Sequence, residues 1–114
     1  MLRVCPTKYS LLAGSVGKLV RDKIPQIIEA SGKTPITRIL ERDEYLACLE
    51  AKLDEEVREF HESKEPEELA DILEVVCALA EAHGCSRQQL QEIYQKKNAA
   101  RGGFEKRIFL EGKG

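Results

Sequence analysis

The sequence contains no tryptophan, and aromatic residues make up only 5% of its 114 residues. It also has no long apolar run, and no segment approaches the roughly 18–20 residues that a membrane-spanning helix requires. Charge of one sign does not dominate either, because the formal net charge is only −2. Such a balance gives no general attraction to nucleic acid or to anionic lipid. We therefore expect a protein that binds neither nucleic acid nor a membrane.

The four cysteines, Cys5, Cys48, Cys77 and Cys85, are widely spaced and form no C-x-x-C pair. His83-Gly84-Cys85 has no second pair of soft ligands with which to hold zinc. The spacing indicates neither a disulfide framework nor a zinc site, and it favours a reduced, cytoplasmic location.

What is abundant is charge, at 33% of the residues, which suits helices with wide polar faces. The length fits one domain. Residues 1–17 lack acidic side chains and helical periodicity, so we predict a flexible N-terminal extension there and a single helical domain over 18–114. Pro, Gly and capping residues predict helices over 22–31, 43–61, 66–83 and 86–101. The alternating segment 104–110 is expected to pair with 35–40 as a small β-ribbon.

Two acidic phrases, Glu56-Val-Arg-Glu59 and Glu68-Leu-Ala-Asp71, organise the chain. In each phrase the carboxylates are three residues apart, so both lie on one face of a helix. At about 100° per residue they fall beside an apolar stripe on each helix. The stripes consist of Leu46, Leu49, Leu53, Val57 and Phe60, and of Leu69, Ile72, Leu73, Val76 and Ala80. We expect the four carboxylates to converge at the border of a helix–helix contact.

Converging carboxylates require compensation, because two such charges 5 Å apart repel by roughly 3 kcal/mol at an effective dielectric constant near 20. Hard oxygen ligands favour Mg²⁺ or Mn²⁺. The alternative is a solvated acidic face, which accounts for the outward residues Glu55, Glu62, Glu65, Glu67 and Glu74. It does not account for two acidic pairs with the same offset beside an apolar stripe. We favour a metal site, in which Glu56 or Glu59 left free of metal would serve as general base.

Basic residues accompany the acidic phrases. Lys18 and Arg21 precede the first helix, where phosphate would also meet free backbone N–H groups, although solubilising charges are an equally good interpretation. Lys97 and Arg101 are four residues apart on the last helix, a spacing that places both on one helical face.

The arrangement Glu55-Glu-x-x-Glu59 followed by Glu67-Glu-x-x-Asp71 resembles the signature of the all-α nucleoside triphosphate pyrophosphohydrolases. That superfamily includes MazG-like enzymes, phosphoribosyl-ATP pyrophosphohydrolase and dimeric dUTPases. Lys18-Leu-Val-Arg-Asp-Lys-Ile-Pro25 and Arg101-Gly-Gly-Phe104 resemble a small phosphoribosyl-ATP pyrophosphohydrolase-like branch. The resemblance covers residues 18–110.

The resemblance implies an all-α, MazG-like four-helix core assembled as a homodimer or larger oligomer. It implies Mg²⁺ held by Glu56, Glu59, Glu68 and Asp71, with Lys97, Asn98 and Arg101 binding phosphate. The implied reaction cleaves a nucleoside triphosphate between its α- and β-phosphates, as in house-cleaning of the nucleotide pool. The alternatives are hydrolysis of phosphoribosyl-ATP in histidine biosynthesis, a catalytically silent nucleotide- or metal-binding regulator, and a helical interaction module.

Overall fold

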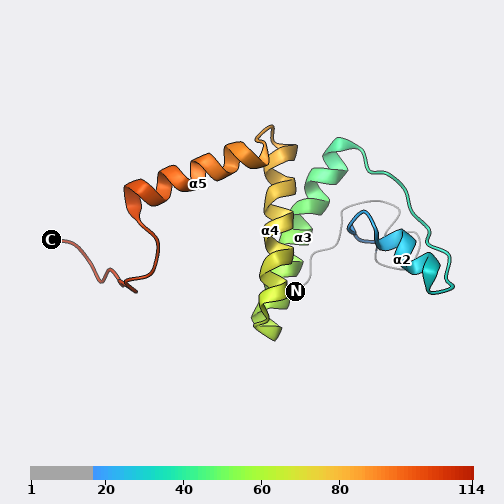
Figure 1. Ribbon diagram of the computed structural model, residues 1–114, viewed down its shortest axis with the longest axis horizontal. Coiled ribbons are helices and arrows are strands. Elements are labelled where there is room, and N and C mark those ends of the chain that lie inside the picture. The colour runs from blue at the N-terminus through green and yellow to red at the C-terminus, as the bar shows by residue number, and fades with distance from the viewer. Residues whose placement is uncertain (1–16) are drawn as a thin grey trace.

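The computed structural model describes residues 17–114, so residues 1–16, and with them most of the predicted extension, lie outside the described residues. The described part is all-α, as predicted (Figure 1). Its helices are α2 (Ile24–Ala30), α3 (Arg42–Ser63), α4 (Pro66–Ala82) and α5 (Arg87–Arg101). Within this range no helix has both the length and the apolar character needed to cross a bilayer.

The centre of the molecule is an antiparallel hairpin of α3 and α4 (Figure 1). The chain reverses at Lys64, which adopts a left-handed backbone conformation with φ 60° and donates its N–H to the Phe60 carbonyl at 2.8 Å. Pro66 then opens α4, at a helix position that needs no N–H donor. At the far end of the hairpin, the Arg42 guanidinium donates to the Ala82 carbonyl at 3.3 Å. Polar contacts therefore fix both ends of the helix pair.

The hairpin core is thin and consists of small side chains. Among the described residues, the buried apolar side chains are Cys48, Leu49 and Ala51 on α3 and Val75 and Cys77 on α4. A chain of this length ordinarily buries a much larger core. Packing of α3 against α4 therefore buries only a small part of the apolar residues in the sequence.

The faces with which α3 and α4 contact each other are not the predicted apolar stripes. They are rotated about the helix axes toward the acidic residues. Glu56, predicted at the border of the contact, is only 6% exposed, whereas Leu69 and Leu73, predicted inside, are 49% and 63% exposed. Helix α4 is apolar on two sides, so the hydrophobic pattern alone did not determine which side meets α3. The assignment of Leu69 and Leu73 to the intrachain contact was wrong.

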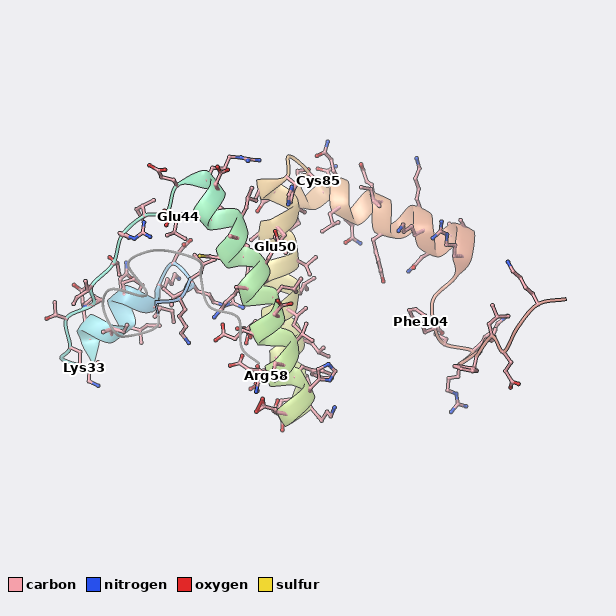
Figure 2. All side chains as sticks on the ribbon, turned by 180° about the vertical axis from the view of Figure 1, so that it is seen from behind. Lys33, Glu44, Glu50, Arg58, Cys85 and Phe104 are labelled. Carbon is pink, nitrogen blue, oxygen red and sulfur yellow. The ribbon has the colours of Figure 1, made fainter. Side chains whose placement is uncertain are left out.

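Helix α5 begins with the predicted capping box. The Gln89 backbone N–H donates to Ser86 Oγ at 3.1 Å, and the Ser86 backbone N–H donates to Gln89 Oε1 at 2.8 Å. Arg87 donates to Glu74 at 3.1 Å and ties the start of α5 to α4. Beyond this point α5 extends away from the hairpin (Figure 2). It has no buried residue. The radius of gyration is accordingly 17.9 Å, compared with roughly 13 Å for a compact domain of this length.

The predicted β-ribbon is absent, because the described residues contain no strand. Segments 35–40 and 104–110 lie at opposite ends of the molecule (Figure 1). An isolated pair of strands is only marginally stable, so a ribbon without a sheet or helix beneath it has little to hold it together. Arg38 instead forms hydrogen bonds of 3.1 and 2.8 Å to the Glu44 carboxylate, which attach the first segment to the start of α3.

Candidate metal centre

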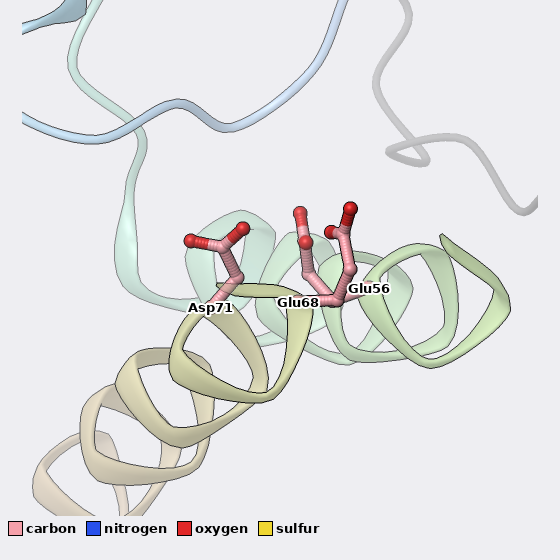
Figure 3. Close-up of side chains that lie close together, drawn as sticks. All are labelled: Glu56, Glu68 and Asp71. Carbon is pink, nitrogen blue, oxygen red and sulfur yellow. The ribbon is translucent and has the colours of Figure 1, made fainter. Parts of the chain in front are cut away.

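Three carboxylates from the two helices of the hairpin meet at its closed end. Glu56 lies in the last third of α3, and Glu68 and Asp71 lie in the first two turns of α4. One oxygen from each of the three lies within 4.8 Å of the others, and all three side chains point to the same side of the hairpin (Figure 3). The antiparallel reversal produces this meeting, because it places the end of α3 beside the start of α4. We call these three residues the carboxylate triad.

Glu56 is the buried member of the triad, with only 7% of its side chain exposed. Its Oε1 lies 3.3 Å from Lys52 Nζ, whereas its Oε2 is shielded from solvent and has no hydrogen-bond partner among the described residues. Burial raises the pKa of Glu56, the proximity of Glu59 raises it further, and Lys52 opposes both. A buried acceptor without a partner costs about 1–3 kcal/mol. This position therefore suits a carboxylate whose free oxygen receives a ligand.

Glu59, the fourth predicted ligand, lies beside Glu56 but outside the triad. It is exposed, and it acts on Glu56 by proximity rather than by sharing the space between the helices. Glu59 is three residues after Glu56, so its side chain points about 60° away from that of Glu56 around the helix axis. Glu56 occupies the helix contact, and this rotation places Glu59 on the solvent side of the contact.

Lys52 belongs to the site although the sequence interpretation did not select it. Its Nζ lies 2.9 Å from Glu55 Oε2 and 3.3 Å from Glu56 Oε1, and the side chain is only 17% exposed. Burial acts to lower the pKa of Lys52, but the two carboxylates outweigh it and leave that pKa raised. The signal was present in the sequence, because a lysine three and four residues before two glutamates lies on their face of the helix.

The segment before α2, residues 17–23, passes along the side of the hairpin toward which the triad points (Figure 3). We call it the basic strap. Arg21 donates from one guanidinium nitrogen to Asp71 Oδ1 at 2.7 Å, and Lys18 Nζ lies 3.7 Å from Glu55 Oε1. Both predicted phosphate-binding residues of this segment therefore reach the site, where they pair with carboxylates.

In the described part of the chain, acidic groups outnumber basic groups around the triad. The basic groups that contact it or its neighbour Glu55 are Lys18, Arg21 and Lys52. The acidic groups are Glu55, Glu56, Glu59, Glu68 and Asp71. Among the described residues, five carboxylates therefore stand against three cations. Oxygen ligands without sulfur or imidazole match hard ions such as Mg²⁺ and Mn²⁺, and Glu56 Oε2 would supply one of them.

The structure does not bring Lys97, Asn98 or Arg101 to the triad of the same chain. They lie on α5, which starts at the opposite end of α4 from Glu68 and leads away from it (Figure 1). All three are exposed. Helical spacing predicted that they share a face, but it carried no information on where that face points.

Without metal, Glu56→Gln is expected to stabilise the fold at neutral pH by about 1 kcal/mol, because a neutral amide is less costly to bury and can donate to the neighbouring carboxylates. The folded pKa of Glu56 is raised above its ordinary value of 4.5. Its favourable contribution is therefore complete below pH 4.5 and is lost as pH rises through the folded pKa. Urea denaturation in a chelator should show the gain at pH 7 and its disappearance toward pH 4.5. Exposed Glu67→Gln is the control, and a loss of stability in Glu56→Gln at pH 7 would contradict the prediction.

Comparison with known proteins leaves the family open. No family model matches the chain, and no solved structure matches it. A protein of Mycolicibacterium smegmatis described as uncharacterized is 61% identical over 44 residues, which cover 39% of this chain and 45% of the relative. The matched stretch therefore spans less than half of either protein.

Proposed function

We propose that the protein is a Mg²⁺-dependent nucleoside triphosphate pyrophosphohydrolase of the all-α superfamily that its acidic phrases resemble. The observation that carries the proposal is the buried Glu56 oxygen, which has no partner among the described residues and stands beside two further carboxylates. A merely solvated acidic face would not bury one of its charges. An interaction module for a basic partner would need accessible charges, whereas Glu56 is 6% exposed.

Glu56, Glu68 and Asp71 would hold Mg²⁺ or Mn²⁺ through one oxygen each. Bound there, the ion would supply neutralisation of phosphate charge and acidification of the attacking water. Lys52 keeps Glu56 oriented by binding its other oxygen at 3.3 Å. This contact leaves Oε2 for the ligand.

Glu59 is the general base in this proposal. It lies beside the triad yet remains exposed, so it can accept a proton from water that approaches the substrate. Glu56 shares the catalytic role only by fixing the position at which that water is held. This division of labour follows from burial, because Glu56 is enclosed between the two helices whereas Glu59 is open to solvent.

The phosphates would be bound by basic residues from two sources. Lys18 and Arg21 of the basic strap already reach the site. Lys97, Asn98 and Arg101 would reach it from the α5 of a second copy, because α5 of the same chain leads away. We therefore propose a homodimer whose packed helices complete the MazG-like core, acting in the reducing cytoplasm, where Cys48, Cys77 and Cys85 stay free thiols.

The test is a pyrophosphate-release screen over canonical and modified nucleoside triphosphates and phosphoribosyl-ATP, with Mg²⁺ and with Mn²⁺. We expect a monophosphate and pyrophosphate as products, with ¹⁸O from water in the monophosphate if attack is at the α-phosphorus. Turnover of phosphoribosyl-ATP alone would assign the chain to histidine biosynthesis. Release of inorganic phosphate with a diphosphate product would refute the mechanism, and metal binding without turnover of any nucleotide would indicate a silent regulator.

A further inference from the structure

The basic strap is attached to the hairpin by two ion pairs of different kinds. Arg21 binds Asp71, which is a member of the carboxylate triad, at 2.7 Å. Lys18 binds Glu55, which is outside the triad, at a longer distance of 3.7 Å. Binding of a metal ion at the triad would therefore affect the first attachment directly and leave the second in place.

A guanidinium and a divalent cation compete for the same carboxylate. Both are attracted to Asp71, and at neighbouring positions they repel each other. A phosphoryl oxygen offers the guanidinium an equivalent partner, since the fork of Arg donors fits phosphate as well as carboxylate. A substrate that arrives with the metal thus supplies a new partner at the moment when Arg21 loses the old one.

We propose that Arg21 is an exchangeable counter-ion: it holds Asp71 in the metal-free protein, and it moves to a substrate phosphate when a divalent cation occupies the triad. The inference rests on the proposed function, and it adds a second role to a residue assigned there only to phosphate binding. The strap would then close on a polyphosphate only after the metal has bound.

The exposure and the backbone around the pair fit such an exchange. The Arg21 side chain is 54% exposed and that of Asp71 is 39% exposed, so neither is locked in place by packing. Arg21 precedes the first turn of α2 and belongs to no helix. Lys52, by contrast, is only 17% exposed, so its side chain is more closely packed than that of Arg21.

Calorimetric titration with Mn²⁺ tests the competition. Arg21→Gln is expected to bind Mn²⁺ about three- to tenfold more tightly than wild type, because removing an exposed pair of this kind releases Asp71 at little cost. Lys18→Gln is the matched control, since it removes a strap charge that pairs outside the triad, and it should change the affinity by less than about twofold. With Mn²⁺ present, Arg21→Gln should bind inorganic imidodiphosphate at least about threefold more weakly.

A second measurement follows the strap itself. Asp71→Asn in the metal-free protein, and Mn²⁺ added to wild type, should both accelerate tryptic cleavage within residues 17–23, and imidodiphosphate added with Mn²⁺ should slow it again. Unchanged or weakened Mn²⁺ binding in Arg21→Gln, with wild type binding normally, would overturn the exchange and leave the proposed function standing. Failure of wild type to bind Mn²⁺ at all would overturn both.

Discussion

Replacing Glu68 with glutamine is expected to weaken Mn²⁺ binding at least tenfold and to lower kcat/KM for the nucleotide by at least about a hundredfold, a loss of roughly 2.7 kcal/mol of transition-state stabilisation. Glu68 lies in the first turn of α4 and supplies one of the three converging oxygens. An amide oxygen carries no net charge, so the substitution removes one of the negative charges that would hold the cation. Calorimetry and steady-state kinetics at fixed Mn²⁺ measure the two losses on one preparation.

Glu67→Gln is the matched control for this experiment, because it makes the same chemical change one residue earlier on the same helix. One residue turns a side chain by about 100°, and Glu67 is exposed outside the triad. It should change both quantities by less than about threefold, in line with an exposed charge screened by solvent. Equal damage from the two substitutions would show that general acidity, rather than the face occupied by the triad, determines activity.

A glutamate in place of Leu73 is expected to convert a homodimer into monomers. Leu69 and Leu73 are 49% and 63% exposed and are one turn apart on α4, so they form an apolar stripe that residues 17–114 leave largely uncovered. Ile93 and Tyr94 on α5 add further exposed apolar surface at 49% and 57%. A stable dimer that covers these faces would bury more than about 1,000 Å² in total. An unpaired charge buried in such an interface costs several kcal/mol.

Sedimentation equilibrium at high micromolar concentration measures this effect. Wild type should be dimeric and Leu73→Glu monomeric, with an increase of at least about a hundredfold in the dissociation constant. Ile36→Glu provides the control, because Ile36 is 99% exposed on the connection between α2 and α3, away from the α4 stripe. A wild-type protein that remains monomeric at these concentrations would refute the dimer, and with it the supply of phosphate-binding residues from a second α5.

Local chemistry made much of the fold predictable. Pro66 and the Ser86–Gln89 capping box identified the starts of α4 and α5, because each satisfies or avoids the free N–H groups of a first helical turn. Not every cap was correct. The predicted ranges 22–31 and 43–61 took Asp22 and Asp43 as N-caps, but the structure has Lys23 at the N-cap of α2 and Glu41 at that of α3. Neither helix uses a side-chain cap.

The way the helices pack against one another could not be predicted from local sequence chemistry. A helix with apolar residues on two sides, such as α4, has two candidate packing faces, and periodicity cannot rank them. The direction of α5 depends on a turn at Gly84 (φ 85°) and on the contacts beyond it, which no spacing rule describes. Three of the four carboxylates predicted to converge do so, because their placement depends mostly on helical geometry, whereas Glu59 lies outside the group. The Arg21–Asp71 pair joins residues 50 positions apart and could not be predicted.

Only Lys64 and Glu65 separate α3 from α4. The number of residues between Glu56 and Glu68 therefore determines how their carboxylates lie relative to each other. An insertion within 57–63 would rotate the rest of α3 by about 100° and move it by 1.5 Å. Such an insertion would change the direction of α4 and increase the distance between Glu68 and Glu56. Length changes in the connection before α3 or in the tail after α5 leave this spacing untouched. We therefore expect one residue inserted within 57–63 to disturb the carboxylate geometry more than one inserted before α3 or after α5.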